Sequence, residues 1–81
     1  MKLKDLKFDD TSIMTGQKLG KHTFKNGYTI SVLKNGEQAK WFNAVIFDKT
    51  ESMIDAPDGL AYGMDITAKE VQELINFAQE I

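Results

Sequence analysis

The stretch KWFNAVIFD, residues 40–48, is apolar on both sides of a predicted strand. Successive side chains of a strand point to opposite faces of its sheet. The alternate positions form two rows, one of Trp41, Asn43, Val45 and Phe47 and the other of Phe42, Ala44 and Ile46. A strand that is apolar on both faces is normally covered on both faces. We therefore predict a central strand of the sheet. One of its faces would pack against another part of this chain, and the other face would be covered from outside the chain.

The segments on either side of this stretch predict an antiparallel meander. Asn26-Gly27 indicates a type I′ hairpin, because both central positions of that turn need positive φ. It leads into YTISVL (28–33), whose apolar and polar side chains alternate, and Asn35-Gly36 then indicates a second hairpin into 40–48. Met53 and Ile54 are a further short strand candidate. The turn at 57–59 precedes LAYGMDI (60–66), which alternates again. It is predicted as the fourth strand, after a short extended piece over 22–25 and the strands 28–33 and 40–48.

A C-terminal helix is predicted over residues 67–81. Thr67 and Glu70 have the spacing of a capping box, and Ile66 and Val71 have the spacing of a hydrophobic staple. The apolar positions recur at helical spacing: Val71, Leu74, Ile75 and Ala78, with Phe77 and Ile81 beside them. The predicted fold class is α+β, an antiparallel meander of about four strands with this amphipathic helix packed on one face.

The length of 81 residues fits one domain, residues 1–81. Residues 22–66 form the predicted meander. The segment 1–21 has no clear pattern: residues 15–21, TGQKLGK, are predicted as a loop, and Ile13 and Met14 are expected to reach the core. A domain of this size is marginal on its own, and the chain has no cysteine for a disulfide, so oligomerisation is a reasonable expectation.

Charge is unevenly distributed along the chain. The net charge is −2, and all ten basic residues are lysine. Residues 1–40 carry eight lysines and four acids, 8 − 4 = +4, whereas residues 41–81 carry two lysines and eight acids, 2 − 8 = −6. Sequence-specific reading of duplex DNA relies on the planar fork of arginine, so direct nucleic-acid binding is not favoured. No apolar run reaches the roughly 20 residues that span a bilayer, and no secretory signal is present, so we expect a soluble cytoplasmic protein.

No catalytic or metal-binding pattern is present in the sequence. His22 is the sole histidine, which excludes a multi-histidine metal site, and no nucleophile lies near it in sequence. The turn DAPDG (55–59) lacks the alternating oxygen ligands of a calcium-binding loop. We therefore predict a protein that is not an enzyme and uses no cofactor or metal.

Two groups of residues are candidates for contact with a partner. Trp41, Phe47 and Tyr62 are candidate interface anchors, because tryptophan and tyrosine are enriched at protein interfaces. The acidic residues are a candidate surface for a basic partner: Asp48, Glu51, Asp55, Asp58 and Asp65. Phe24 and Tyr28, with lysines nearby, leave single-stranded nucleic-acid binding as a further alternative.

Three segments resemble small accessory proteins of tailed bacteriophages. They are NGYTISV (26–32), WFNAVIF (41–47) and DITAKEV (65–71), which match an NGY-x-x-SV strand, an apolar Ala-Val strand and a Thr-x-x-Glu-Val helix. The resemblance covers about residues 22–81. The N-terminal segment and the acidic stretch 51–58 depart from it, and no functional residue is carried over. It implies a small non-catalytic protein that occupies a surface on a host or defence complex, as anti-CRISPR proteins do.

The leading hypothesis is therefore a phage-type protein that binds and inhibits or modulates a host or defence complex, in the host cytoplasm. The first alternative is a homodimeric structural or accessory protein, in which the second face of the sheet pairs across a two-fold axis. The second alternative is the single-stranded nucleic-acid binder.

Overall fold

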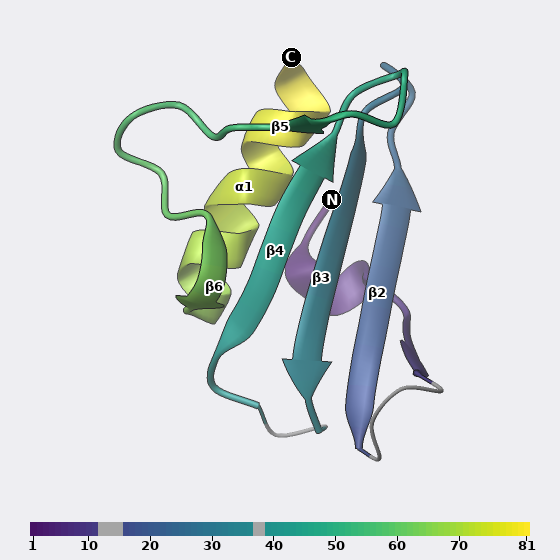
Figure 1. The fold of residues 1–81 in the computed structure, drawn as a ribbon, viewed down its shortest axis with the longest axis vertical. Coiled ribbons are helices and arrows are strands. Elements are labelled where there is room, and N and C mark those ends of the chain that lie inside the picture. Colours follow the sequence, from purple (N-terminus) through teal and green to yellow (C-terminus); the bar gives the residue numbers. More distant parts are fainter. Residues whose placement is uncertain (12–15, 37–38) are drawn as a thin grey trace.

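The computed structural model describes residues 1–11, 16–36 and 39–81 and consists of an antiparallel sheet with a C-terminal helix packed against it (Figure 1). The α+β prediction is confirmed. The described elements are, in chain order, η1 (Leu3–Asp5), β1 (Phe8–Asp10), β2 (Gln17–Thr23), β3 (Thr29–Asn35), β4 (Phe42–Phe47), β5 (Met53–Ile54), β6 (Gly63–Ile66) and α1 (Ala68–Glu80). The predicted core positions Ile13 and Met14 lie outside the described residues.

The stretch 40–48 provides the central strand, β4. The strands follow the order β1-β2-β3-β4-β5, and β6 also pairs with β4. β3 pairs with one edge of β4 along its length. On the other edge, β5 pairs with Ile46 and Phe47, and β6 pairs with Phe42 and Ala44 at the opposite end. β4 is therefore hydrogen-bonded on both sides, which agrees with its prediction as a central strand.

The N-terminal part of the sheet differs from the prediction. The loop predicted over residues 15–21 is wrong for most of its length, because β2 begins at Gln17. Gly20, which falls in the predicted loop, instead lies inside β2, where the segment of Leu6 and Phe8 approaches it closely. A Cβ atom there would lie 2.9 Å from Leu6 Cγ and 3.1 Å from Phe8 Cδ2. Glycine inside a strand often marks such an approach. With β1 and the two-residue β5 added, the described sheet has six strands instead of about four.

The strand predicted over 60–66 is also shorter than expected, since β6 begins at Gly63. Gly63 and Asp65 have φ values of 93° and 56°, and the pairing register shifts between Phe42 and Ala44. A β-bulge of this kind disrupts the ladder locally and bends the strand. The alternation in 60–66 could not reveal the bulge, because a bulge depends on pairing with a neighbouring strand.

The first Asn-Gly pair forms a hairpin of another type than predicted. Gly27 has φ 89°, whereas Asn26 is not among the residues with positive φ. Gly27 N donates to Phe24 O at 2.9 Å, and Phe24 N donates to Tyr28 O at 2.8 Å. This is a three-residue loop with glycine in the left-handed position, not a type I′ turn. It leaves the Asn26 side chain free to bind α1: Nδ2 donates to Ala78 O at 2.8 Å and to Ile81 O at 2.7 Å.

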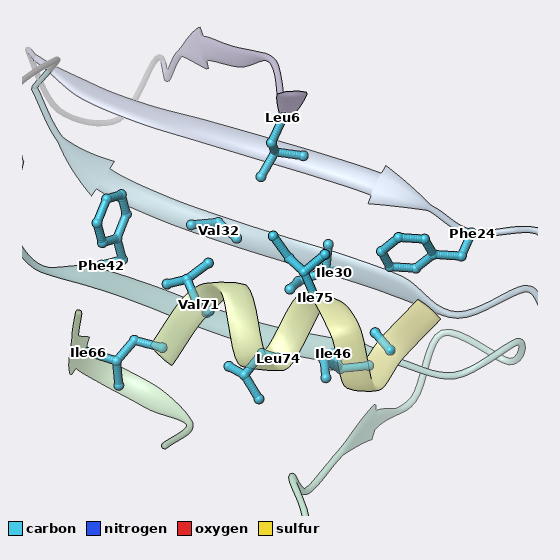
Figure 2. Packing of buried hydrophobic residues seen from close by; sticks show 12 residues of the cluster. Leu6, Phe24, Ile30, Val32, Phe42, Ile46, Ile66, Val71, Leu74 and Ile75 are labelled. Carbon is cyan, nitrogen blue, oxygen red and sulfur yellow. The ribbon is translucent and has the colours of Figure 1, made fainter. Parts of the chain in front are cut away.

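The core lies between α1 and the side of the sheet that carries Ile30, Val32 and Ile46 (Figure 2). The helix begins as predicted: Thr67 Oγ1 accepts from Glu70 N at 3.2 Å, and Glu70 Oε1 accepts from Thr67 N at 2.8 Å. The buried helix residues are Val71, Leu74, Ile75 and Ala78. Each of them is completely inaccessible to solvent, which confirms the predicted apolar stripe.

The N-terminal segment is held on the helix by glutamine side chains. Gln72 Oε1 accepts from Leu3 N at 2.7 Å, and Gln72 Nε2 donates to Met1 O at 2.9 Å. Leu6, just after η1, is buried in the core. The polar side of α1 therefore anchors η1, a role that the helical pattern did not reveal.

Candidate functional site

One face of the sheet is covered by α1 and η1, and the other face is not covered by the described chain. Figure 1 shows α1 and η1 on the same side of the long strands. Ala44 and Ile46 are buried on that side, whereas Val45 and Phe47, which alternate with them, are partly exposed and do not belong to the core cluster. The described chain thus supplies one of the two predicted covers of β4, and the second cover, expected from outside this chain, stays a prediction. We call the uncovered side of β2 to β5 the open face.

Strand register identifies the side chains of the open face. Directly paired residues of neighbouring strands point to the same side. The three rows across it are Leu19–Leu33–Asn43, Lys21–Ser31–Val45 and Thr23–Thr29–Phe47–Met53. The apolar members are Leu19, Leu33, Val45, Phe47 and Met53. Leu19 is 38% exposed and Met53 is 59% exposed, so apolar surface reaches solvent on both sides of the central strands.

The open face carries one cation in its rows, one acid at its rim and a further acid, Asp9, beside it on β1, where Asp9 pairs with Leu19. Lys21 lies in the middle row, and Glu51 lies in the connection after β4. Both line a cavity of about 180 Å³ together with Thr23, Thr29 and Phe47. The two threonines are joined by a hydrogen bond of 2.8 Å between their Oγ1 atoms. Within β2 to β5 the rows of the open face therefore carry one charged side chain, Lys21, and carboxylates lie at two of its borders, Glu51 and Asp9.

The turn that places Glu51 is built by Asp48. Asp48 Oδ1 accepts from Thr50 Oγ1 at 2.6 Å, from Thr50 N at 2.8 Å and from Ser52 N at 3.0 Å. These bonds, the Thr50 hydroxyl first, hold the pKa of the Asp48 carboxyl below its ordinary value. Glu51 has φ 66°, a left-handed conformation that is uncommon outside glycine. Asp48 thus organises the rim of the open face, and one of its two carboxylate oxygens, Oδ1, already accepts three internal hydrogen bonds.

A second, larger groove continues the open face beyond β2. It has a volume of about 520 Å³ and is lined on the open-face side by Leu19, Lys21 and Leu33 and on the other side by Lys7, Asp9 and Asp10. Its lining combines apolar side chains with charges of both signs.

The three predicted interface aromatics do not form one cluster. Phe47 lies on the open face, whereas Trp41 precedes the opposite end of β4 and is 59% exposed. Six residues of strand separate them by roughly 20 Å. Tyr62 lies in the connection before β6 and is partly buried. Of the three, Phe47 is placed within the open face, and the exposure of Trp41 leaves its ring available for contact.

The predicted acidic residues are likewise dispersed. Asp48 and Glu51 share the turn after β4, while Asp55 and Asp58 are exposed in the long connection between β5 and β6 (Figure 1). Asp65 N donates to Asn43 Oδ1 at 3.1 Å, which places Asp65 beside the start of β4. From Asn43 to Asp48 the strand extends roughly 17 Å. The structure therefore brings together Asp48 and Glu51 and spreads the other three acids along a flank of the sheet.

The aromatic residues considered for base stacking are not free for it. Phe24 is buried in the core, with the exposed His22 ring packed edge-on against it at 4.8 Å between centroids, and Tyr28 is partly buried against the core. Lys34 Nζ lies 4.1 Å from the centroid of the Phe8 ring, and Lys18 Nζ pairs with Asp10 Oδ1 at 2.7 Å. A stacking platform for single-stranded nucleic acid is not formed by these residues.

Within residues 1–11, 16–36 and 39–81, no three histidine or acidic side chains gather into a group that would hold a metal ion. In the same described ranges, no helix combines the length and apolar character that crossing a lipid bilayer requires.

Sequence reasoning missed most of the open face. Leu19 and Lys21 lie in the segment predicted as a loop, and Leu33 was grouped with its strand without being assigned to a face. Alternation in YTISVL places Leu33 with Thr29 and Ser31, away from Ile30 and Val32. The alternation in the sequence could therefore have placed Leu33 on this face, whereas no pattern in the sequence indicated that β2 pairs with β3.

Comparisons of this chain with protein-family models, with curated proteins and with solved structures found no match.

Proposed function

We propose that this protein acts without catalysis, by burying the open face of its sheet against the surface of another protein. The observation that supports the proposal is the uncovered apolar surface of β2 to β5, on the side of the sheet opposite to the core under α1. Contiguous exposed apolar surface marks interaction sites on folded proteins. The low charge of the face fits a partner surface that is itself apolar and nearly neutral at its centre.

The size of the open face indicates how much binding it supplies. Fully burying one large apolar side chain contributes roughly 1.5–3 kcal/mol. The five apolar residues are already partly shielded, so completing their burial contributes about 1 kcal/mol each, or about 5 kcal/mol together. A micromolar complex requires about 8 kcal/mol. We therefore expect the partner to contact the rim as well, where Trp41 and the Asp48–Ser52 turn are exposed.

The resemblance to phage accessory proteins supports the class of partner. Proteins of that kind inhibit or modulate host or defence complexes by occupying a surface, as anti-CRISPR proteins do. We propose the same mode of action here, with the partner being a protein of the host cell. Glu51, at the rim, would meet a cationic group of that partner, because complementary charge guides association and fixes register.

A matched pair of substitutions tests the proposal. Val45→Glu places a carboxylate at the centre of the open face, whereas Ala68→Glu makes the same change of charge at an exposed position in the first turn of α1. Circular dichroism should show both variants folded. In affinity capture from a bacterial host lysate, we expect the wild type and Ala68→Glu to retain the same host complex and Val45→Glu to lose it.

Retention of the same complex by Val45→Glu would refute the use of the open face. Sedimentation velocity then measures the oligomeric state and shows whether a second copy of the chain covers the open face. If the wild type is a dimer that Val45→Glu dissociates while capture is unchanged, the open face belongs to a second copy, and the proposed partner-binding role of this surface is wrong.

A further inference from the structure

The outer edge of β2 is paired along only part of its length. β1 pairs with Lys18, Leu19 and Gly20, and the N-terminal chain then departs toward η1. The last residues of β2, Lys21 to Thr23, are exposed. An unpaired strand edge is a template on which another extended segment can add.

Hydrogen bonds in the structure identify which backbone groups are free there. In an antiparallel pair, residues that exchange backbone hydrogen bonds alternate with residues that do not. Phe24 N donates to Tyr28 O, so Phe24 and His22 bond toward β3, and Thr23 between them faces outward. Thr11 N donates to Gln17 O across the other edge, which agrees with this alternation. No described residue bonds to the N–H and C=O of Thr23.

Space for an added segment is present along this edge. A groove of about 400 Å³ is lined by Lys7, Lys21 and His22, and a neighbouring groove of about 550 Å³ is lined by His22, Thr23 and Lys25. The two grooves share Met1 and His22. They therefore adjoin each other between the end of β2 and the N-terminal segment, and we call the pair the channel.

The charges along the channel favour an acidic segment over a second copy of this chain. Its lining includes three lysines, Lys7, Lys21 and Lys25, and one carboxylate, Asp5, while Glu51 lies on the open-face side of Lys21 and Thr23. A second copy of this chain is disfavoured, because antiparallel pairing of two copies about Thr23 would bring Lys21 of one copy near Lys25, in the hairpin loop of the other. Like charges opposite one another destabilise a strand pair. Acidic side chains at the same positions would instead be attracted.

We propose that the outer edge of β2 binds an extended acidic segment of a partner protein as an added antiparallel strand. The central residue of that segment exchanges both backbone hydrogen bonds with Thr23. The residue two positions after it then pairs with Lys21, and the residue two positions before it lies near Lys25, the first residue of the hairpin loop, so the preferred segment has acidic residues four positions apart. Strand addition to a sheet edge is an established mode of peptide recognition. This site goes beyond the proposed function, since it requires the edge of the sheet and not burial of its open face.

The test uses the full chain and two capped nine-residue peptides, SVETVTEVS and its lysine counterpart SVKTVTKVS. Binding is followed by amide chemical shifts in nuclear magnetic resonance titrations. We expect the acidic peptide to shift the amides of residues 21–25 and to slow hydrogen exchange at Thr23 N–H, and the lysine peptide to bind at least tenfold more weakly.

Two variants separate the contributions of charge and backbone. In the double variant Lys21→Glu, Lys25→Glu the preference should reverse, so that the lysine peptide binds better. Thr23→Pro removes the free N–H while leaving the ladder to β3 intact, because that N–H faces outward. It should weaken binding of the acidic peptide at least tenfold in a folded chain.

Equal binding of the two peptides to the wild type, or no shifts at millimolar acidic peptide, would overturn the proposal. Shifts centred on Leu33 and Val45 would also overturn it, and would assign the peptide to the open face. If oligothymidine shifts the residue 21–25 amides and the acidic peptide does not, the edge binds nucleic acid and the proposal is wrong. Capture of a host complex through the open face is unaffected by any of these results.

Discussion

Val45 and Ile46 are neighbours on β4 that point to opposite faces of the sheet. The loss of stability when each is replaced by alanine therefore shows how far its face of the sheet is buried. Ile46 is completely buried between the sheet and α1. Replacing such a residue by alanine removes buried methyl and methylene groups and leaves a cavity, which destabilises a protein by about 2–5 kcal/mol. We expect Ile46→Ala to fall in this range.

Val45 lies at the centre of the open face and is partly exposed. The two methyl groups lost in Val45→Ala would contribute about 1.6 kcal/mol if fully buried, at about 0.8 kcal/mol per group. Partial exposure reduces the expected loss to about 0.8 kcal/mol. A chain of this length has a total stability of roughly 4–12 kcal/mol, so Ile46→Ala removes a large share of it and Val45→Ala a small one.

Urea unfolding followed by circular dichroism measures both losses, with the m value checked for constancy. The measurement is repeated at several protein concentrations, because association makes apparent stability depend on concentration. A Val45→Ala loss equal to that of Ile46→Ala would refute our description of the open face. If that loss grows with protein concentration, a second copy covers the face in solution.

Three further predictions concern the frame around the open face. Asn26→Ala removes the two side-chain hydrogen bonds to the end of α1 and should lower the free energy of unfolding in urea by about 1–3 kcal/mol. The control Asn35→Ala, at the other Asn-Gly pair, should change it by less than about 0.5 kcal/mol. Equal effects of the two substitutions would contradict the role of Asn26. Gly20→Ala forces its new Cβ against Leu6 and should cost about 1–3 kcal/mol, and an unchanged unfolding midpoint would show that Leu6 does not pack there. Because hydrogen bonds lower the pKa of Asp48 in the folded state, its stabilising effect is fully present above the unfolded pKa of about 3.9 and is lost as pH falls through the folded pKa. Asp48→Asn should therefore be less stable than wild type at pH 7 in urea unfolding, and the difference should shrink as the pH is lowered below about 3.9. A difference that does not change with pH would contradict this.

Local signals predicted the elements whose structure depends on nearby residues. The capping box at Thr67 and Glu70 formed as expected, because both of its hydrogen bonds join residues three apart. Alternation along 40–48 correctly separated the side chains of β4 into two rows, because the strand geometry itself sets that separation. The predicted type of the first hairpin was wrong: the loop has three residues, and its Asn26 side chain bonds to the end of α1, a segment more than fifty residues away.

The candidate site was less accessible to sequence reasoning. Trp41, Phe47 and Tyr62 were grouped by residue type, and the structure places them in different parts of the molecule. The acidic residues were grouped by their position in one half of the chain, but β4 separates Asp65 from Asp48 by most of its length. Residue type indicates a tendency to form contacts, whereas the position of a surface depends on which segments the fold makes neighbours.

The sequence by itself determined that this chain forms an antiparallel sheet with one amphipathic helix, and that its central strand is apolar on both sides. These properties follow from periodicity, turn residues and capping, all of which act over a few residues. Only the tertiary structure decided which row of β4 lies under α1 and which remains uncovered. It also decided that the polar segment 17–23 becomes a strand with a partly unpaired edge. Both outcomes depend on pairing and packing between distant segments, because one helix can cover only one face of the sheet.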